Sequence, residues 1–106
     1  MKINLKSLKF TAKKHLVDFV EEKVSKLERF DDKIISAEVT LYVQDGKHTD
    51  NKACDIRLVI PGNDLIVKRN ATTFQEAVLN GVETLQNLLN RKREKNSHSD
   101  ISEIMG

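Results

Sequence analysis

Residues 35–43, ISAEVTLYV, carry the clearest β-strand pattern of the chain. Their apolar and polar residues alternate, with Ile35, Ala37, Val39, Leu41 and Val43 set against Ser36, Glu38, Thr40 and Tyr42. Successive side chains of a strand point to opposite faces, so this alternation predicts a strand with one buried face and one solvent-exposed face. The chain has 106 residues, which is enough for one domain with a single modest core.

Three further strand patterns flank this segment. Residues 1–6 and residues 54–60 alternate in the same way, and residues 65–71 supply the last strand. Only the turn segment PGND, residues 61–64, separates the last two, so we expect these strands to pair antiparallel. The single cysteine, Cys54, falls in an alternating run and is interpreted as a small buried hydrophobic residue.

Two amphipathic helical patterns complete the chain. The first covers about residues 12–30, with Thr11 as its expected N-cap. The second begins at a capping box, in which Thr73 caps the helix and Glu76 reaches back to the cap residue. It ends in the basic segment 91–95, where cations complement the helix dipole.

The order of these elements is β-α-β-β-β-α. A right-handed crossover through the first helix makes the first two strands parallel, and short connections make the later strands antiparallel. Two helices with one apolar stripe each can cover one face of a four-stranded sheet. The sequence therefore predicts an α+β fold in which both helices pack on the same face of the sheet and the other face contacts water.

Basic residues gather towards the two ends of this predicted domain. Residues 1–30 have eight Lys and Arg against four Asp and Glu, and residues 65–96 have six against three. Residues 31–64 have the opposite balance, four against seven, while the formal net charge of the chain is only +2. This asymmetry favours a polyanion-binding side, and the alternative is that the charges are only the solvated faces of helices.

The sequence offers no constellation for catalysis. Its glycines are isolated, which excludes a phosphate-binding loop, and His15, His48 and His98 are not at metal-ligand spacing. We therefore expect no enzyme, no cofactor, no metal site and no small-molecule substrate. The first residues lack the apolar segment of a signal peptide, and no apolar run approaches membrane-spanning length. We expect a cytoplasmic protein without membrane contact.

Two lines of polar and basic residues follow the edges of the predicted apolar stripes. The line on the first helix consists of His15, Phe19, Lys23 and Lys26. The line on the second helix consists of Asn80, Thr84, Asn87, Arg91 and Lys95, with Lys92 and Arg93 beside its end. If the helices pack side by side, the basic residues are expected to border one groove and to contact the phosphates of structured RNA. The alternative for each basic residue is that its side chain only covers the edge of the core or complements the dipole at a helix end.

The chain resembles the ribosome hibernation-promoting factors and ribosome-associated translation inhibitors, a family also called sigma-54 modulation proteins. The resemblance extends from residue 1 to about residue 95 and rests on element order together with short segments: 16–20, 23–28, Phe30 with Asp31 and the strand 34–43, 64–69, 73–78 and 85–95. It implies a fold similar to that of double-stranded-RNA-binding domains for residues 1–95. Residues 96–106 are polar and lack a long apolar period, so we expect them to be a disordered tail.

The resemblance also implies a function. Members of this family bind the small ribosomal subunit in the channel for messenger RNA and the A- and P-site transfer RNAs, and thereby silence ribosomes during stationary phase or stress. The expected partners are the small subunit and its ribosomal RNA, bound by a chain that is monomeric when free. The matching basic positions are Lys23, Lys26, Arg91 and Lys95, and Lys92 and Arg93 lie in the matching basic end.

This chain departs from the family pattern on the second helix. The family often has Lys or Arg where the chain has Thr84 and Asn87, and often an acid where it has Leu79, so the expected basic surface is thinner than in many members. The alternative function is a protein-interaction module of the same fold, which binds through its open sheet face or an edge strand. Phosphate binding weakens steeply with salt and an apolar contact does not, so salt dependence separates the two.

Overall fold

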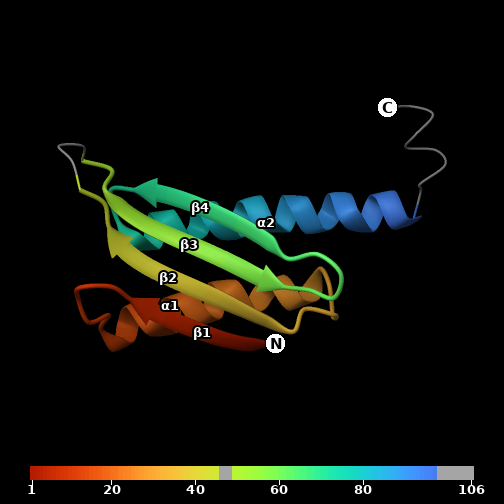
Figure 1. Cartoon of the computed structure of the whole chain (residues 1–106), viewed down its shortest axis with the longest axis horizontal. Coiled ribbons are helices and arrows are strands. Elements are labelled where there is room, and N and C mark those ends of the chain that lie inside the picture. Colours follow the sequence, from red (N-terminus) through yellow and green to blue (C-terminus); the bar gives the residue numbers. More distant parts are fainter. Residues whose placement is uncertain (46–48, 98–106) are drawn as a thin grey trace.

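The computed structural model describes residues 1–45 and 49–97, with the side chains of 92–97 left out. Over these residues the element order is β-α-β-β-β-α, as predicted, with one additional 3₁₀ turn (Figure 1). The elements are β1 (Lys2–Ser7), α1 (Lys14–Ser25), the 3₁₀ turn η1 (Lys26–Arg29), β2 (Ser36–Val43), β3 (Lys52–Val59), β4 (Leu65–Ala71) and α2 (Phe74–Ser97). The α+β fold class predicted from the sequence is confirmed.

The strands form one sheet in the order β1-β2-β3-β4. β1 runs parallel to β2, with Lys2 opposite Ser36, and the other two pairs are antiparallel. Both helices lie on one face, α1 behind β1 and β2 and α2 behind β3 and β4, and they run in the same direction (Figure 1). β1 and β4 are therefore the two edge strands, and the second face of the sheet is left without a helix.

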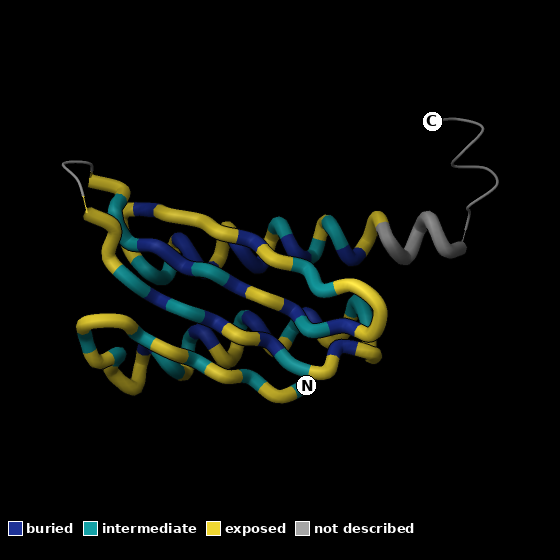
Figure 2. Tube along the Cα trace, in the orientation of Figure 1, coloured by how far each residue is buried: buried dark blue, intermediate teal, exposed yellow. Residues whose placement is uncertain are grey.

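The core lies between the sheet and the helices, where burial alternates along the strands as the sequence predicts (Figure 2). Its fully buried members include Val39 and Leu41 of β2, Ile56 of β3, and Val20 of α1. Cys54 is also buried there, and burial raises the pKa of its thiol to about 12. The interpretation of this cysteine as a core residue is confirmed.

The start of α2 follows the predicted capping box in one half only. Thr73 caps the helix, because its hydroxyl accepts a hydrogen bond from the Glu76 backbone N–H at 3.1 Å. The Glu76 carboxylate accepts a hydrogen bond from the Thr72 hydroxyl at 3.2 Å. The Glu76 side chain was expected to bond the cap residue Thr73, and it bonds the preceding Thr72 instead.

The prediction of an N-cap at Thr11 is wrong. α1 begins at Lys14, and the preceding Lys13 is extended and makes no side-chain cap hydrogen bond. The chain turns at Lys9, whose φ is 64°, and then places the Phe10 ring on the Phe74 ring at 4.9 Å between centroids. This stacking connects the segment before α1 with the first residue of α2, and α1 begins two residues later than the sequence pattern predicts.

The predicted ends of both helices shift slightly. The first helix tightens into η1, which ends at Arg29 and buries Leu27 completely. α2 extends through Ser97, two residues beyond the predicted end, while the rest of the predicted tail, 98–106, lies outside the described residues. Among the helices that the structure describes, none is long and apolar enough to cross a membrane.

Candidate RNA-binding surface

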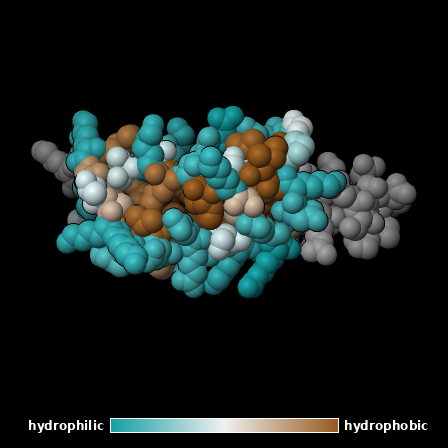
Figure 3. All heavy atoms as spheres, turned by 90° about the horizontal axis from the view of Figure 1, so that it is seen from below, coloured by the Kyte–Doolittle hydropathy of each residue, from teal (hydrophilic) through white to brown (hydrophobic). Residues whose placement is uncertain are grey.

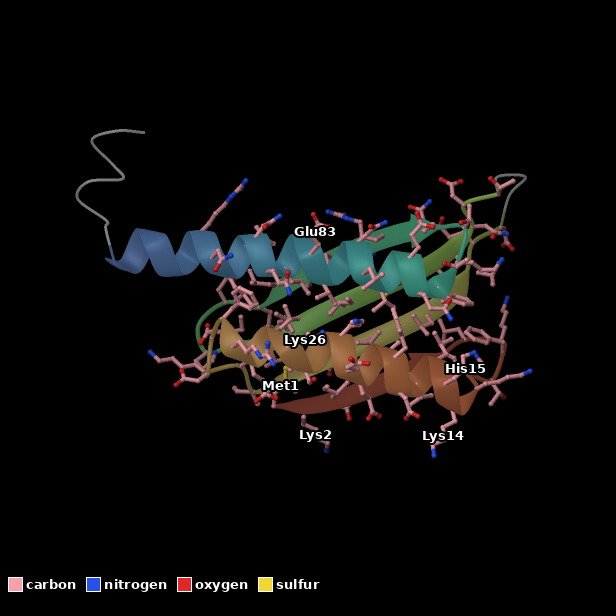
Figure 4. The ribbon with its side chains drawn as sticks, turned by 180° about the vertical axis from the view of Figure 1, so that it is seen from behind. Met1, Lys2, Lys14, His15, Lys26 and Glu83 are labelled. Atoms are coloured by element: carbon pink, nitrogen blue, oxygen red, sulfur yellow. The ribbon has the colours of Figure 1, made fainter. Side chains whose placement is uncertain are left out.

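The basic line of the first helix lies on the flank of α1 that faces α2. Lys23 is half-buried, with its ammonium 5.6 Å from the centre of the Phe19 ring. Lys26 follows at the start of η1, also half-buried. On the opposite flank, Glu28 forms an ion pair at 3.4 Å with the amino group of Met1, which lies beside β1 (Figure 4). The two lysines are thus separated from that carboxylate by the body of the helix.

The polar line of the second helix lies on the other flank of α2, against β4. The evidence is Thr84, whose hydroxyl accepts a hydrogen bond from Nη2 of Arg69 on β4 at 3.1 Å. Asn80 and Arg91 are one turn before Thr84 and two turns after it, so they belong to the same flank. Arg91 is exposed near the last described side chains.

The two basic lines therefore do not border one groove, as the sequence had led us to expect. Lys23 and Lys26 lie between the helices, whereas Arg91 lies beyond α2 on the β4 side. The reason is that a helix has two flanks, and the flank that carries Arg91 is the one that turns away from α1. The backbone of Lys92, Arg93 and Lys95 belongs to α2, and their side chains are outside the description.

The end of α2 projects past the sheet (Figure 1). The last fully buried residue described on α2 is Leu89, at 1 % exposure, so Arg91 follows directly on the end of the packed region. The exposed Arg91 therefore lies where α2 leaves the sheet (Figure 1). This geometry suits contact with a large charged partner better than enclosure of a small ligand.

Arg69 is a basic residue of this surface that the sequence reasoning missed. It is exposed, and it precedes the buried Ala71 and follows the buried Val67 on the helix side of β4. The signal was present in the sequence, because strand alternation places residue 69 on the same side as these two core residues. An arginine at a core-facing position near the end of an edge strand must reach out past the helix to find water.

The open face of the sheet differs in its electrostatics. Arg57 donates hydrogen bonds to Asp64 from Nε at 2.9 Å and from Nη2 at 2.6 Å, and it lies 3.7 Å from Glu38. The Arg57 guanidinium holds the pKa of Asp64 below its ordinary value, and Asp64 raises the pKa of Arg57. Beside them the Tyr42 hydroxyl donates to Asp55 at 3.0 Å, and burial and that bond raise the pKa of Tyr42.

The paired cation Arg57 lies on the open face, and Lys2, Lys6 and Lys68 on the same face form no ion pair among the described residues. Within residues 1–45 and 49–91, Lys23, Lys26, Arg69 and Arg91 have no ion pair with a carboxylate, whereas Arg57 has two. Cations without acidic partners keep their full charge for an anionic ligand. Over the same residues, no three His, Cys, Asp or Glu side chains come together in a way that could hold a metal ion.

Comparison with known proteins then relates the chain to a family. Residues 3–97 match the model of the family described as sigma 54 modulation protein / S30EA ribosomal protein. The chain belongs to this family. The match covers most of the 106 residues, from the second position of β1 to the end of α2, and it confirms the resemblance seen in the sequence.

Two solved structures are similar in fold to this S30EA-family chain. The N-terminal domain of Thermus thermophilus Protein Y is 25 % identical with a TM-score of 0.74, over 86 % of this chain and 98 % of that domain. A ribosomal subunit interface protein from Coxiella burnetii shares the fold at 16 % identity with a TM-score of 0.78, over 90 % of this chain and all of that one. A comparison with curated proteins gives no match. The chain is thus a member of a ribosome-associated family, with the fold of its relatives.

Proposed function

We propose that this protein binds the small ribosomal subunit through ribosomal RNA and inhibits translation by occupying the channel for messenger and transfer RNA. The observation that supports this most is the match of residues 3–97 to the S30EA ribosomal protein family. Among residues 1–45 and 49–91, Lys23, Lys26 and Arg91 have no carboxylate partner, so their charges are available to RNA phosphates. Family membership supplies the ribosome as the partner.

The mechanism needs no chemistry on the bound RNA. Lys and Arg contact phosphates, and the bound domain excludes the messenger and transfer RNAs from the space that it fills. In this proposal the protein works in the cytoplasm as a monomer during stationary phase or stress. Its six candidate contacts are Lys23, Lys26, Arg91, Lys92, Arg93 and Lys95.

Salt dependence follows directly from phosphate binding. Each neutralised phosphate releases counterions, so six contacts lower affinity by about a thousandfold between roughly 50 and 200 mM salt. Replacing Lys23 and Lys26 by Glu removes two contacts, which lowers the slope of log affinity against log salt by about 2. The test measures binding of the protein to purified small subunits over this range of salt, and inhibition of translation in an extract.

A matched control lies on the other face. Lys2 and Lys6 are exposed on β1 and point to the open side of the sheet, so their replacement by Glu changes net charge by the same amount. This control pair is expected to bind nearly as wild type. Equal losses from the two double variants would show that binding is not localised on the helix side, and a wild-type protein that stays at the top of a low-salt gradient would refute ribosome binding.

A protein partner is the second candidate, favoured by apolar residues near the edge strands. Figure 3 shows apolar patches among hydrophilic residues on the face seen from below Figure 1. At the β1 edge, Met1, Ile3 and Leu5 are only partly buried. On the opposite edge strand, Ile66 is 60 % exposed. Binding through such residues loses little affinity as salt rises, so a flat salt dependence would favour this candidate over RNA.

A further inference from the structure

Arg69 is held in place by neutral partners. Its Nη1 donates to the carbonyl of Lys68 at 2.8 Å, and its Nη2 donates to the Thr84 hydroxyl at 3.1 Å. That hydroxyl in turn donates to the carbonyl of Asn80 at 2.9 Å, one turn earlier on α2. The guanidinium is therefore oriented across the space between β4 and α2 by a chain of hydrogen bonds.

This arrangement leaves the charge of Arg69 available. A guanidinium has five N–H donors, and the two bonds described use two of them, which leaves about three for a ligand. The Arg69 side chain is exposed and forms no ion pair with a carboxylate among residues 1–45 and 49–91. Glu83, which precedes Thr84, is exposed on α2 (Figure 4) and lies outside ion-pair distance of Arg69.

Arg91 places a second arginine on the same flank. It follows Thr84 by seven residues, which is two helical turns or roughly 10 Å along the axis. Phosphates follow one another along a nucleic-acid backbone over longer distances than this, so one RNA can contact both arginines directly. A planar, pre-oriented guanidinium matches the oxygens of a phosphate and loses little side-chain entropy on binding.

We propose that Arg69 contacts a phosphate of ribosomal RNA, and that Thr84 is the positioning residue that holds its guanidinium beside α2 for this contact. The proposal rests on the RNA binding proposed above, and it places a second RNA-contacting line on the β4 side of α2, formed by Arg69 and Arg91. In this chain β4 thus supplies the cation Arg69 beside position 84 of α2, where the helix itself has the neutral Thr84.

The test compares neighbours on one strand. Arg69→Gln and Lys68→Gln each remove one positive charge, and the two side chains lie on opposite faces of β4, with Lys68 on the open side. Arg69→Gln is expected to weaken binding to purified small subunits about tenfold and to lower the salt slope by about one. Lys68→Gln is expected to stay within about twofold of wild type, since long-range attraction alone is screened.

Thr84→Val separates positioning from charge. It removes the hydroxyl and keeps both arginines, so binding is expected to weaken a few-fold while the salt slope stays near that of wild type. Thermal unfolding of each variant checks that the domain is intact. Wild-type affinity in Arg69→Gln, or equal losses in Arg69→Gln and Lys68→Gln, would overturn the role of Arg69 and leave ribosome binding standing. A wild-type protein that fails to bind small subunits would overturn both proposals.

Discussion

Gly81 allows α2 to approach the sheet closely because it has no Cβ, and its replacement by alanine tests that packing. The residue is buried in the middle of α2, over β3. A Cβ at this position would lie 2.9 Å from Cδ1 of Ile56, closer than two carbon atoms normally approach. The next neighbours, Cγ2 of Val67 at 3.7 Å and Cγ1 of Ile56 at 3.8 Å, are at ordinary contact distance.

Two opposing effects decide the outcome of Gly81→Ala. Alanine in a helix interior is favoured over glycine by about 1 kcal/mol. Overpacking of a core costs about 1–3 kcal/mol, and Ile56 is completely buried, so its terminal methyl has little room to move. Taking about 2 kcal/mol for the clash, we expect Gly81→Ala to lower the free energy of unfolding by about 1 kcal/mol.

The variant Ile56→Val removes the obstructing Cδ1 and leaves the rest of the side chain. Alone it is expected to cost about 1 kcal/mol, as such truncations do. In its background Gly81→Ala meets only ordinary contacts, so the helix preference returns and the change stabilises by about 1 kcal/mol. The two substitutions are therefore coupled by about 2 kcal/mol.

Urea unfolding of the wild type, both single variants and the double variant, followed by circular dichroism, measures this coupling. For a domain of this size each kcal/mol also shifts the melting temperature by about 4–8 °C, which gives a second readout. If Gly81→Ala changes stability equally in both backgrounds, to within about 0.5 kcal/mol, the contact between α2 and Ile56 does not control packing here.

Three further outcomes follow from the structure. Cys54 should react with a thiol reagent only after unfolding, because its pKa of about 12 keeps the buried thiol protonated, and rapid labelling of the native protein would contradict this. The pKa of Asp64 lies below its ordinary value of 3.8, so the stabilisation that it gives is present above that pH and is lost as the pH falls through the lowered pKa. Asp64→Asn should therefore flatten the acid side of the stability profile, measured by urea unfolding against pH, and an unchanged profile would argue against the Arg57 pair. Deletion of residues 98–106 should leave the melting temperature unchanged and small-subunit binding unchanged or slightly tighter, since it removes Asp100 and Glu103, whereas a large loss of affinity would assign a function to this segment.

The fold was predictable because the local patterns and the topology rules agree. Alternation in residues 36–43 specifies β2, and the cap at Thr73 specifies the start of α2. The crossover of a βαβ unit is almost always right-handed, which leaves one arrangement of β1, α1 and β2. The start of α1 was not predictable in the same way. Thr11 is an acceptable cap by residue type, but stacking of Phe10 on Phe74 joins segments that are more than sixty residues apart. No local pattern contains that contact, and the helix begins where the stacked turn allows it.

For the candidate site, the sequence predicts which residues share one flank of a helix, but not what that flank faces. The apolar stripe of α2 fixes which side faces the sheet, and the polar line from Asn80 to Arg91 follows as one of its two flanks. Which flank meets α1 depends on strand order and on the parallel course of the helices, and these place the line against β4. The basic lines are therefore separated by the width of α2, about 10 Å. A partner that contacts Lys26 and Arg91 together must then lie across α2, which requires an extended polyanionic surface such as folded RNA and excludes a ligand held between the helices.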